Sequence, residues 1–272
     1  MVAVRDLDAA AERWRRLGFT VSPRGTHSPH LGSGNYTIVF AIDYIELLGI
    51  LAETPHNAAT RAFLAQREGL ERVAFTALDS AAGVAELQAR GIAATGPVSF
   101  GRPVDLPDGG KTEAKFCVMH WPVDEKPGGL RIFACQHLTR EAVWIKSLQT
   151  HANTARRLME VEMLTLDPKA AGAQMTRLID QPAEALADGA VRVRSGASRA
   201  DFIFLDRATL ARRHAGVDLA GLPAAGAVGL RIAVADAAAA AKAVGAAGII
   251  GAGTVTVPAS AATGVMITFD AT

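Results

Sequence analysis

One carboxylate occurs inside an otherwise apolar, strand-like segment early in the chain. Glu46 lies in residues 44–50 (YIELLGI), where its neighbours are apolar, aromatic or glycine. Because side chains alternate between the two faces of a strand, Tyr44, Glu46 and Leu48 share one face. A carboxylate on a buried face costs free energy unless it is paired or functional. If this face lines a cavity, Glu46 is a candidate metal ligand or general base.

A glycine-rich loop precedes this strand and carries further polar side chains. Residues 25–37 (GTHSPHLGSGNYT) contain His27, His30 and Asn35. Such loops present backbone N–H groups and side chains at the mouth of a pocket, although an ordinary connection before a strand has the same composition. The loop matches neither a phosphate-binding loop nor a dinucleotide fingerprint, and the chain has no nucleophile elbow. His30 and Asn35 are therefore candidate ligand contacts, with His27 beside them.

The elements that must position these residues repeat along the chain. A pattern of an Asp and a Gly twelve residues apart, with an Ala-rich amphipathic segment between them, occurs three times; the copies start at Asp6, Asp79 and Asp236. A fourth, weaker copy starts at Asp167. Asp can cap the first turn of a helix, and Gly can end the helix in a left-handed conformation. A short apolar run precedes each helix. The repeat predicts four units, each a strand, a helix and further strands.

The predicted elements follow this repeat. Helices are expected at 7–17, 57–68 and 80–90, and strands at 2–4, 19–22, 36–41, 44–50, 72–77, near 93, at 115–120 and at 130–137. Residues 102–111 should form an exposed loop, and residues 141–158 a helix that docks the two halves. Later strands are expected at 159–166, 191–193, 201–204, 230–234, 249, 254–257 and 265–269. We predict two domains, 1–140 and 141–272, with two units in each.

These βαβββ units, paired within each half, resemble the vicinal oxygen chelate superfamily, which includes glyoxalase I, extradiol dioxygenases and bleomycin-resistance proteins. The resemblance is carried by VAVRDLDAAAERWRRLGFTV, the glycine-rich loop, DYIELLGI and GGLRIFACQH, and the first half is closest to glyoxalase-like domain proteins. It implies an α+β fold in which four βαβββ units pair into two cupped mixed-sheet halves. It also implies a small-molecule site in the N-terminal cup and a metal-assisted lyase, isomerase or dioxygenase reaction.

The metal ligands that the resemblance implies are incomplete. In metal-binding members a His or Gln on the first strand and a Glu on the closing strand of paired units supply them. Counting back seven residues from each repeat Asp gives a position before Met1 in unit one and Arg72 in unit two. A guanidinium stays charged and cannot bind a metal ion. The closing strands offer Glu46 and Gln136, a poor donor set for a transition metal.

The site hypothesis therefore has a catalytic residue, Glu46, with His30, Asn35, Arg72 and Gln136 as substrate contacts and no metal ligand. A divalent metal stays an implication of the resemblance, with His27, His30 and His137 as the ligands to examine if one binds. The alternative for Glu46 is an ion pair with Arg72 across the cup, with an anionic ligand bridging in. The alternatives for the whole protein are a non-catalytic binding protein of the bleomycin-resistance type and a pseudoenzyme that has lost the metal site.

Composition limits the remaining classes of function. A net charge of +1 over 272 residues argues against charge-driven nucleic-acid binding. No apolar span of membrane length and no basic leader is present, which predicts a cytoplasmic protein. Cys117 and Cys135 lack the spacing of a redox or zinc motif and are expected to be reduced thiols. The expected partner is a small-molecule ligand, with no nucleic acid and no membrane, and a homodimer stays open.

Overall fold

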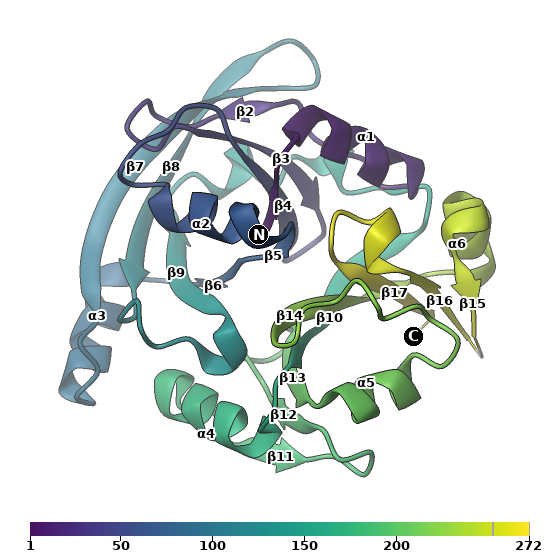
Figure 1. Cartoon of the computed structure of the whole chain (residues 1–272). Coiled ribbons are helices and arrows are strands. Elements are labelled where there is room, and N and C mark those ends of the chain that lie inside the picture. The colour runs from purple at the N-terminus through teal and green to yellow at the C-terminus, as the bar shows by residue number, and fades with distance from the viewer. Residues whose placement is uncertain (252, 272) are drawn as a thin grey trace.

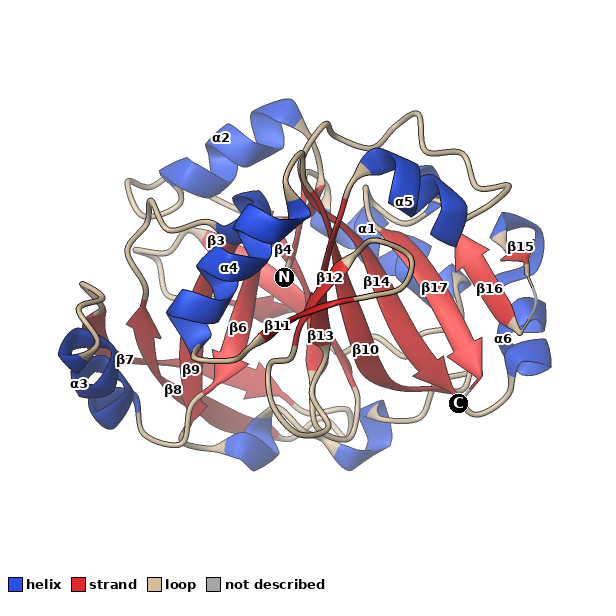
Figure 2. Ribbon diagram, turned by 90° about the horizontal axis from the view of Figure 1, so that it is seen from below, coloured by secondary structure: helices blue, strands red, loops and turns tan. Residues whose placement is uncertain are grey.

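The computed structural model describes residues 1–251 and 253–271, and its four units share one topology (Figures 1 and 2). In unit one, β1 (Val2–Val4) is followed by α1 (Leu7–Arg16), β2 (Gly25–Thr26), β3 (Ser33–Val39) and β4 (Tyr44–Ile50). The sheet order is β2-β3-β4-β1, with β1 parallel to β4 and β3 antiparallel to it. After α2 (Ala58–Gln66), a short β5 (Gly69–Leu70) pairs with the other edge of β1.

Unit two repeats this arrangement. It comprises β6 (Arg72–Thr76), α3 (Ser80–Ala89), β7 (Thr95–Asp105), β8 (Lys111–His120), the 3-10 turn η1 (Pro127–Gly129) and β9 (Arg131–His137). The order is β7-β8-β9-β6, and β6 lies parallel to β9. The 3-10 turns η2 (Arg140–Ala142) and η3 (Lys146–Leu148) lead to the second half.

Units three and four share one eight-stranded sheet, because β10 and β14 pair antiparallel. Unit three contains β10 (Ala155–Leu164), α4 (Pro168–Ile179), β11 (Ala183–Ala185), β12 (Val191–Val193) and β13 (Asp201–Leu205), followed by α5 (Arg207–Arg213). Unit four contains β14 (Gly226–Val234), α6 (Ala237–Val244), η4 (Gly245–Ala247), β15 (Ile249–Ile250), β16 (Thr254–Val257), η5 (Ala259–Ala261) and β17 (Met266–Ala271). The mixed α+β fold that the sequence predicts is confirmed.

The repeated Asp residues cap helices, as their spacing predicts. Asp6 accepts a hydrogen bond from the Ala9 N–H at 2.9 Å, and Asp79, Asp167 and Asp236 make equivalent bonds. Gly18 has a φ of +85°, which a residue with a side chain rarely adopts. The last copy differs, because α6 ends at Gly245 rather than at Gly248.

Three predicted segments are wrong. No strand forms at 19–22, because the Thr20 N–H donates to His151 Nδ1 at 3.0 Å instead of to a strand partner. Residues 102–105 and 111 belong to the strands of the long β7–β8 hairpin, and residues 106–110 form its turn. Residues 141–158 form two 3-10 turns and the start of β10, because Thr154 has a φ of +57° and Asn153 is anchored to the Leu17 carbonyl. Helix α5 was not predicted at all.

Each sheet of the N-terminal half has a helix face and a cup face. Ile45 and Leu47 pack with Leu7 and Trp14 of α1, so the alternate residues of β4 face the cup. This core continues into the second half, where Trp14 Nε1 donates to Thr263 Oγ1 at 2.9 Å. The domain division at residue 140 stays a prediction. Among the described residues, no helix combines the length and the apolar character needed to cross a membrane.

Candidate functional site in the N-terminal cup

The cup formed by units one and two encloses a cavity of about 290 Å³. Its floor comes from the cup faces of β3 and β4 and from β6, β8 and β9, and α2 lies at its rim (Figure 1). Apolar side chains make up much of the wall, including Leu48, Ile50, Phe100, Phe116, Val118 and Phe133. The shared cup of the first two units therefore contains room for a small molecule with an apolar body.

Glu46 lies in this cavity with its side chain turned inward, as the strand alternation predicts. It is 7% exposed, and its Oε1 accepts a hydrogen bond from Asn35 Nδ2 at 2.8 Å. His27 Nε2 lies 3.8 Å from the same oxygen, and His27 Nδ1 hydrogen-bonds Ser33 Oγ at 2.8 Å. Burial lowers the pKa of His27, more than the charge of Glu46 raises it. A neutral imidazole beside a carboxylate is an arrangement that can pass a proton.

Arg72 lines the same cavity but does not pair with Glu46. Its guanidinium hydrogen-bonds Thr60 and forms an ion pair with Glu71, whose second oxygen binds Arg131. Glu71 is only 4% exposed, so it holds both guanidiniums at one place beside β6 and β9. The predicted Glu46–Arg72 ion pair is therefore wrong, because the neighbouring residue supplies the carboxylate.

Gln136 lies on the other face of β9, outside the cavity. Its Oε1 accepts a hydrogen bond from the Ser80 N–H at 3.0 Å, at the start of α3. The strand registers explain this placement. Val2 and Phe75 hold the same position in their units, and they pair with Leu47 and Ala134, so Leu47 corresponds to Ala134. The unit-two counterpart of Glu46 is therefore Phe133, and counting along the sequence reached a residue three positions too far.

Basic side chains gather at one end of the cavity. His30 and His56 lie edge to face with ring centroids 6.1 Å apart, and His120 stacks on Phe133. Burial, followed by nearby charges including those of Arg72 and Arg131, lowers the pKa values of His56 and His120. His30 was predicted as a contact, whereas the role of His56 on the loop before α2 was missed. This end favours an anionic group or a polarised oxygen.

Cys135 also faces the cup and was not proposed as a site residue. Burial raises the pKa of its thiol to about 12, so it is a thiol and not a thiolate at neutral pH. Period-two alternation along β9 from Phe133 would have found it. Cys135 therefore contributes packing rather than a nucleophile.

The donors in the cup fall short of a metal site. Glu46 and His27 are two neighbouring donors, whereas a zinc-type site uses three or four. Asn35 turns its N–H group, not its oxygen, toward Glu46. No group of three or more His, Cys, Asp or Glu side chains in residues 1–251 and 253–271 is arranged to hold a metal ion. The residues present therefore do not fit the divalent metal that the resemblance implies.

Comparison with known proteins decides the family. A family model described as a glyoxalase-like domain matches residues 1–179. The chain belongs to the glyoxalase-like domain family. Its vicinal oxygen chelate fold, inferred from sequence motifs above, is thereby established. No curated protein matches the sequence of this glyoxalase-like protein.

Solved structures agree with the whole fold of this glyoxalase-like protein. A hypothetical protein from Staphylococcus aureus is similar with a TM-score of 0.70 and 12% identity, covering 100% of this chain and 97% of its own. A triple mutant of 4-hydroxymandelate synthase from Streptomyces coelicolor has a TM-score of 0.60 and 11% identity, with 98% and 90% coverage. At these identities the likeness concerns the fold alone.

Proposed function

We propose that the N-terminal cup binds a small oxo acid and that Glu46 moves a proton on the carbon next to its carbonyl group. The observation that carries this proposal is the placement of Glu46, an inward carboxylate held by Asn35 and adjacent to His27 in an apolar-walled cavity. Proton transfer of this kind belongs to the isomerase and lyase classes. It uses only side chains that the chain itself provides.

Each part of the cup has a role in this scheme. The oxygens of the acid lie toward Arg72 and His120, which line the cup, and their N–H groups offset the negative charge that develops on the carbonyl oxygen. Glu46 takes the proton as the C–H bond breaks, and the electron pair enters the enolate. Return of a proton to the opposite face of the same carbon inverts its configuration and completes an isomerisation, with no oxidant needed. His27 can relay the proton between Glu46 and Ser33.

Proton exchange tests this function directly. A panel of 2-oxo acids with aliphatic and aromatic side chains is incubated in D2O with the protein, and loss of the proton signal beside the carbonyl is followed by NMR. Glu46→Gln keeps the shape and the Asn35 contact and is expected to slow exchange by roughly 10²–10⁴-fold, as for loss of a general base. Glu12→Gln, a change on the exposed face of α1, is the matched control.

The alternatives give different results. Exchange that is equally fast in Glu46→Gln would contradict the role of Glu46. Binding of the acids to the wild-type protein with no exchange would contradict catalysis and support the non-catalytic binding protein. Neither binding nor exchange would support the pseudoenzyme.

A further inference from the structure

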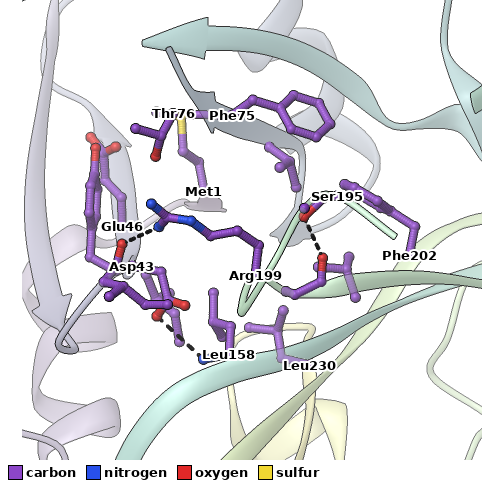
Figure 3. Close-up of a pocket in the computed structure, with 18 of the residues that line it drawn as sticks. Met1, Asp43, Glu46, Phe75, Thr76, Leu158, Ser195, Arg199, Phe202 and Leu230 are labelled. Carbon is purple, nitrogen blue, oxygen red and sulfur yellow. Dashed lines mark hydrogen bonds between the residues drawn. The ribbon is translucent and has the colours of Figure 1, made fainter. Parts of the chain in front are cut away.

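A second and larger cavity lies between the two halves of the chain. It has a volume of about 440 Å³ and is lined by residues 42–46 and 73–76 from the first half and by residues 195–197, 199, 200 and 202 from the second. Figure 3 shows Arg199 and Ser195 on one side of this space and Glu46 and Asp43 on the other. Tyr44 and Glu46 line both this cavity and the cup. Tyr44 and Glu46 therefore lie on the boundary between the two spaces.

The walls of the inter-half cavity are largely apolar. Phe75 and Phe202, from opposite halves, have ring centroids 5.7 Å apart, and Val73, Leu158, Val161 and Leu230 complete this surface. Such a surface accepts a hydrocarbon chain or a ring but offers few hydrogen bonds. A ligand that enters it from the cup must therefore have an apolar middle section.

Cationic groups lie beside this apolar space. Arg199 reaches across the cavity and donates to the Ile42 carbonyl (Figure 3), and this bond occupies only one of its five N–H groups. The guanidinium carbon of Arg140 lies 3.5 Å from the centre of the Trp144 ring, and Trp144 lines the cavity. Neither guanidinium forms an ion pair with a carboxylate of any residue described. Burial, and then the charge of Arg199, lowers the pKa of Arg140, as expected for two nearby cations.

Asp43 is the acidic group that faces Arg199. Its Oδ1 accepts a hydrogen bond from the Leu158 N–H at 3.3 Å, and its Oδ2 is buried without a partner among the described residues. Burial raises its pKa to about 6, although the charges of Arg199 and Arg157 act in the opposite direction. Asp43 forms no ion pair with Arg199 or Arg140 among the described residues, so N–H groups of both guanidiniums stay available to a ligand.

We propose that the inter-half cavity is the second lobe of the site and that Arg199, assisted by Arg140, binds a distal carboxylate of the ligand. The preferred ligand is then an elongated diacid: one acid group lies in the cup, an apolar chain passes Glu46, and the second acid group lies at Arg199. This inference rests on the proposed function for the cup. It makes the second half of the chain a determinant of ligand length and charge.

The test uses simple carboxylates that cannot undergo the proposed reaction. Straight-chain α,ω-dicarboxylates of eight to twelve carbons are compared with monocarboxylates of the same length, by calorimetry and by the fluorescence of the tryptophans, which include Trp144. The diacids should bind more tightly by roughly tenfold, the effect of one charge-assisted hydrogen-bonded pair worth about 1.4 kcal/mol. Arg199→Gln should remove this preference. Arg140→Gln should reduce it in part.

Two further variants keep the outcome decisive. Arg194→Gln, an exposed change near the start of the same loop, should leave the preference intact. Arg199→Lys retains the charge and should retain most of the preference, even if Arg199→Gln does not fold. The inference would be overturned by equal affinity for diacids and monoacids in the wild-type protein. It would also be overturned if the diacid preference survived in Arg199→Gln or in a folded double variant that carries both Arg140→Gln and Arg199→Gln.

The result is separable from the proposed function. A diacid preference with no deuterium exchange in any 2-oxo acid would support this binding lobe and contradict the proton transfer. Exchange that depends on Glu46, with no diacid preference, would support the proton transfer and contradict the role of Arg199.

Discussion

The two cups of this protein have the same strand order but opposite contents. In the N-terminal cup, Glu46 faces a cavity of about 290 Å³ and its nearest basic neighbour is a histidine whose pKa is lowered. In the C-terminal cup, Glu162 is 1% exposed, and its oxygens bind His214 Nε2 at 2.8 Å and Arg213 at 3.2 Å. One carboxylate remains available for chemistry, whereas the other is neutralised within the fold.

The difference comes from the helix that follows the closing strand of units one and three. Helices α2 and α5 occupy this same place in the chain and lie on the same side of the molecule (Figure 2). Helix α2 stays at the rim of its cup, where Thr60 contacts the cavity. Helix α5 and the loop after it enter the other cup, where Leu210 and Leu222 pack on Ile203, Leu205 and Met266. The same fold therefore forms a cup in each half, and the position of the helix that follows the closing strand, α2 or α5, determines whether that cup contains a cavity.

The largest expected effect is on the buried ionic network of the C-terminal cup. Glu162→Gln should lower the free energy of unfolding by about 3–5 kcal/mol, because it removes the buried carboxylate that binds His214 and one of the three carboxylates that bind Arg213. Urea denaturation measures this change. Glu46→Gln should cost less than about 1 kcal/mol by the same measurement, since it keeps an oxygen for Asn35. Similar costs for both variants would remove the distinction between the cups.

The packing of α5 should contribute nearly as much. Leu210 is fully buried, so Leu210→Ala should lower the free energy of unfolding by roughly 3 kcal/mol through lost packing and a new cavity. Leu64→Ala in α2 is the matched change, and it should cost less because Leu64 retains 9% exposure. A larger loss for Leu64→Ala than for Leu210→Ala would show that α5 is not the more tightly packed helix.

The smallest expected effect is a pH-dependent difference at Asp43. Burial raises its pKa from the ordinary 3.8 to about 6, so the folded protein keeps a proton that the unfolded chain has already lost. Its contribution to stability therefore falls as the pH rises from about 4 to 6. Asp43→Asn removes this pH-dependent loss. The free energy of unfolding of Asp43→Asn minus that of the wild-type protein should therefore be about 2 kcal/mol larger at pH 8 than at pH 4.

The quantity to measure is the difference in free energy of unfolding between Asp43→Asn and the wild-type protein. Burial lowers the pKa of His137 to about 4, so His137 makes the protein less stable as the pH falls from about 6.5 to 4, and this effect is present in both. Chemical denaturation at several pH values gives the comparison. A difference that does not change with pH would contradict the raised pKa of Asp43.

Local patterns were sufficient for the units and for one site residue. The Asp positions predicted the helix caps, and the alternation along residues 44–50 predicted that Glu46 faces the cup, because caps and strand faces depend on residues only a few positions apart. The position of Arg72 on the cup wall also followed from the repeat. The resemblance in the first 140 residues gave the superfamily.

Other features depend on contacts between segments far apart in the sequence. The register of β6 on β9 decided that Phe133, and not Gln136, is the counterpart of Glu46, and the turn between β5 and β6 gave Arg72 a different partner in Glu71. The entry of α5 into one cup and the cavity between the halves depend on how whole elements pack. The sequence by itself determined the units and the direction of Glu46, because those follow from local geometry. Only the tertiary structure decided which cup is open and where its cations lie, because these depend on distant segments meeting.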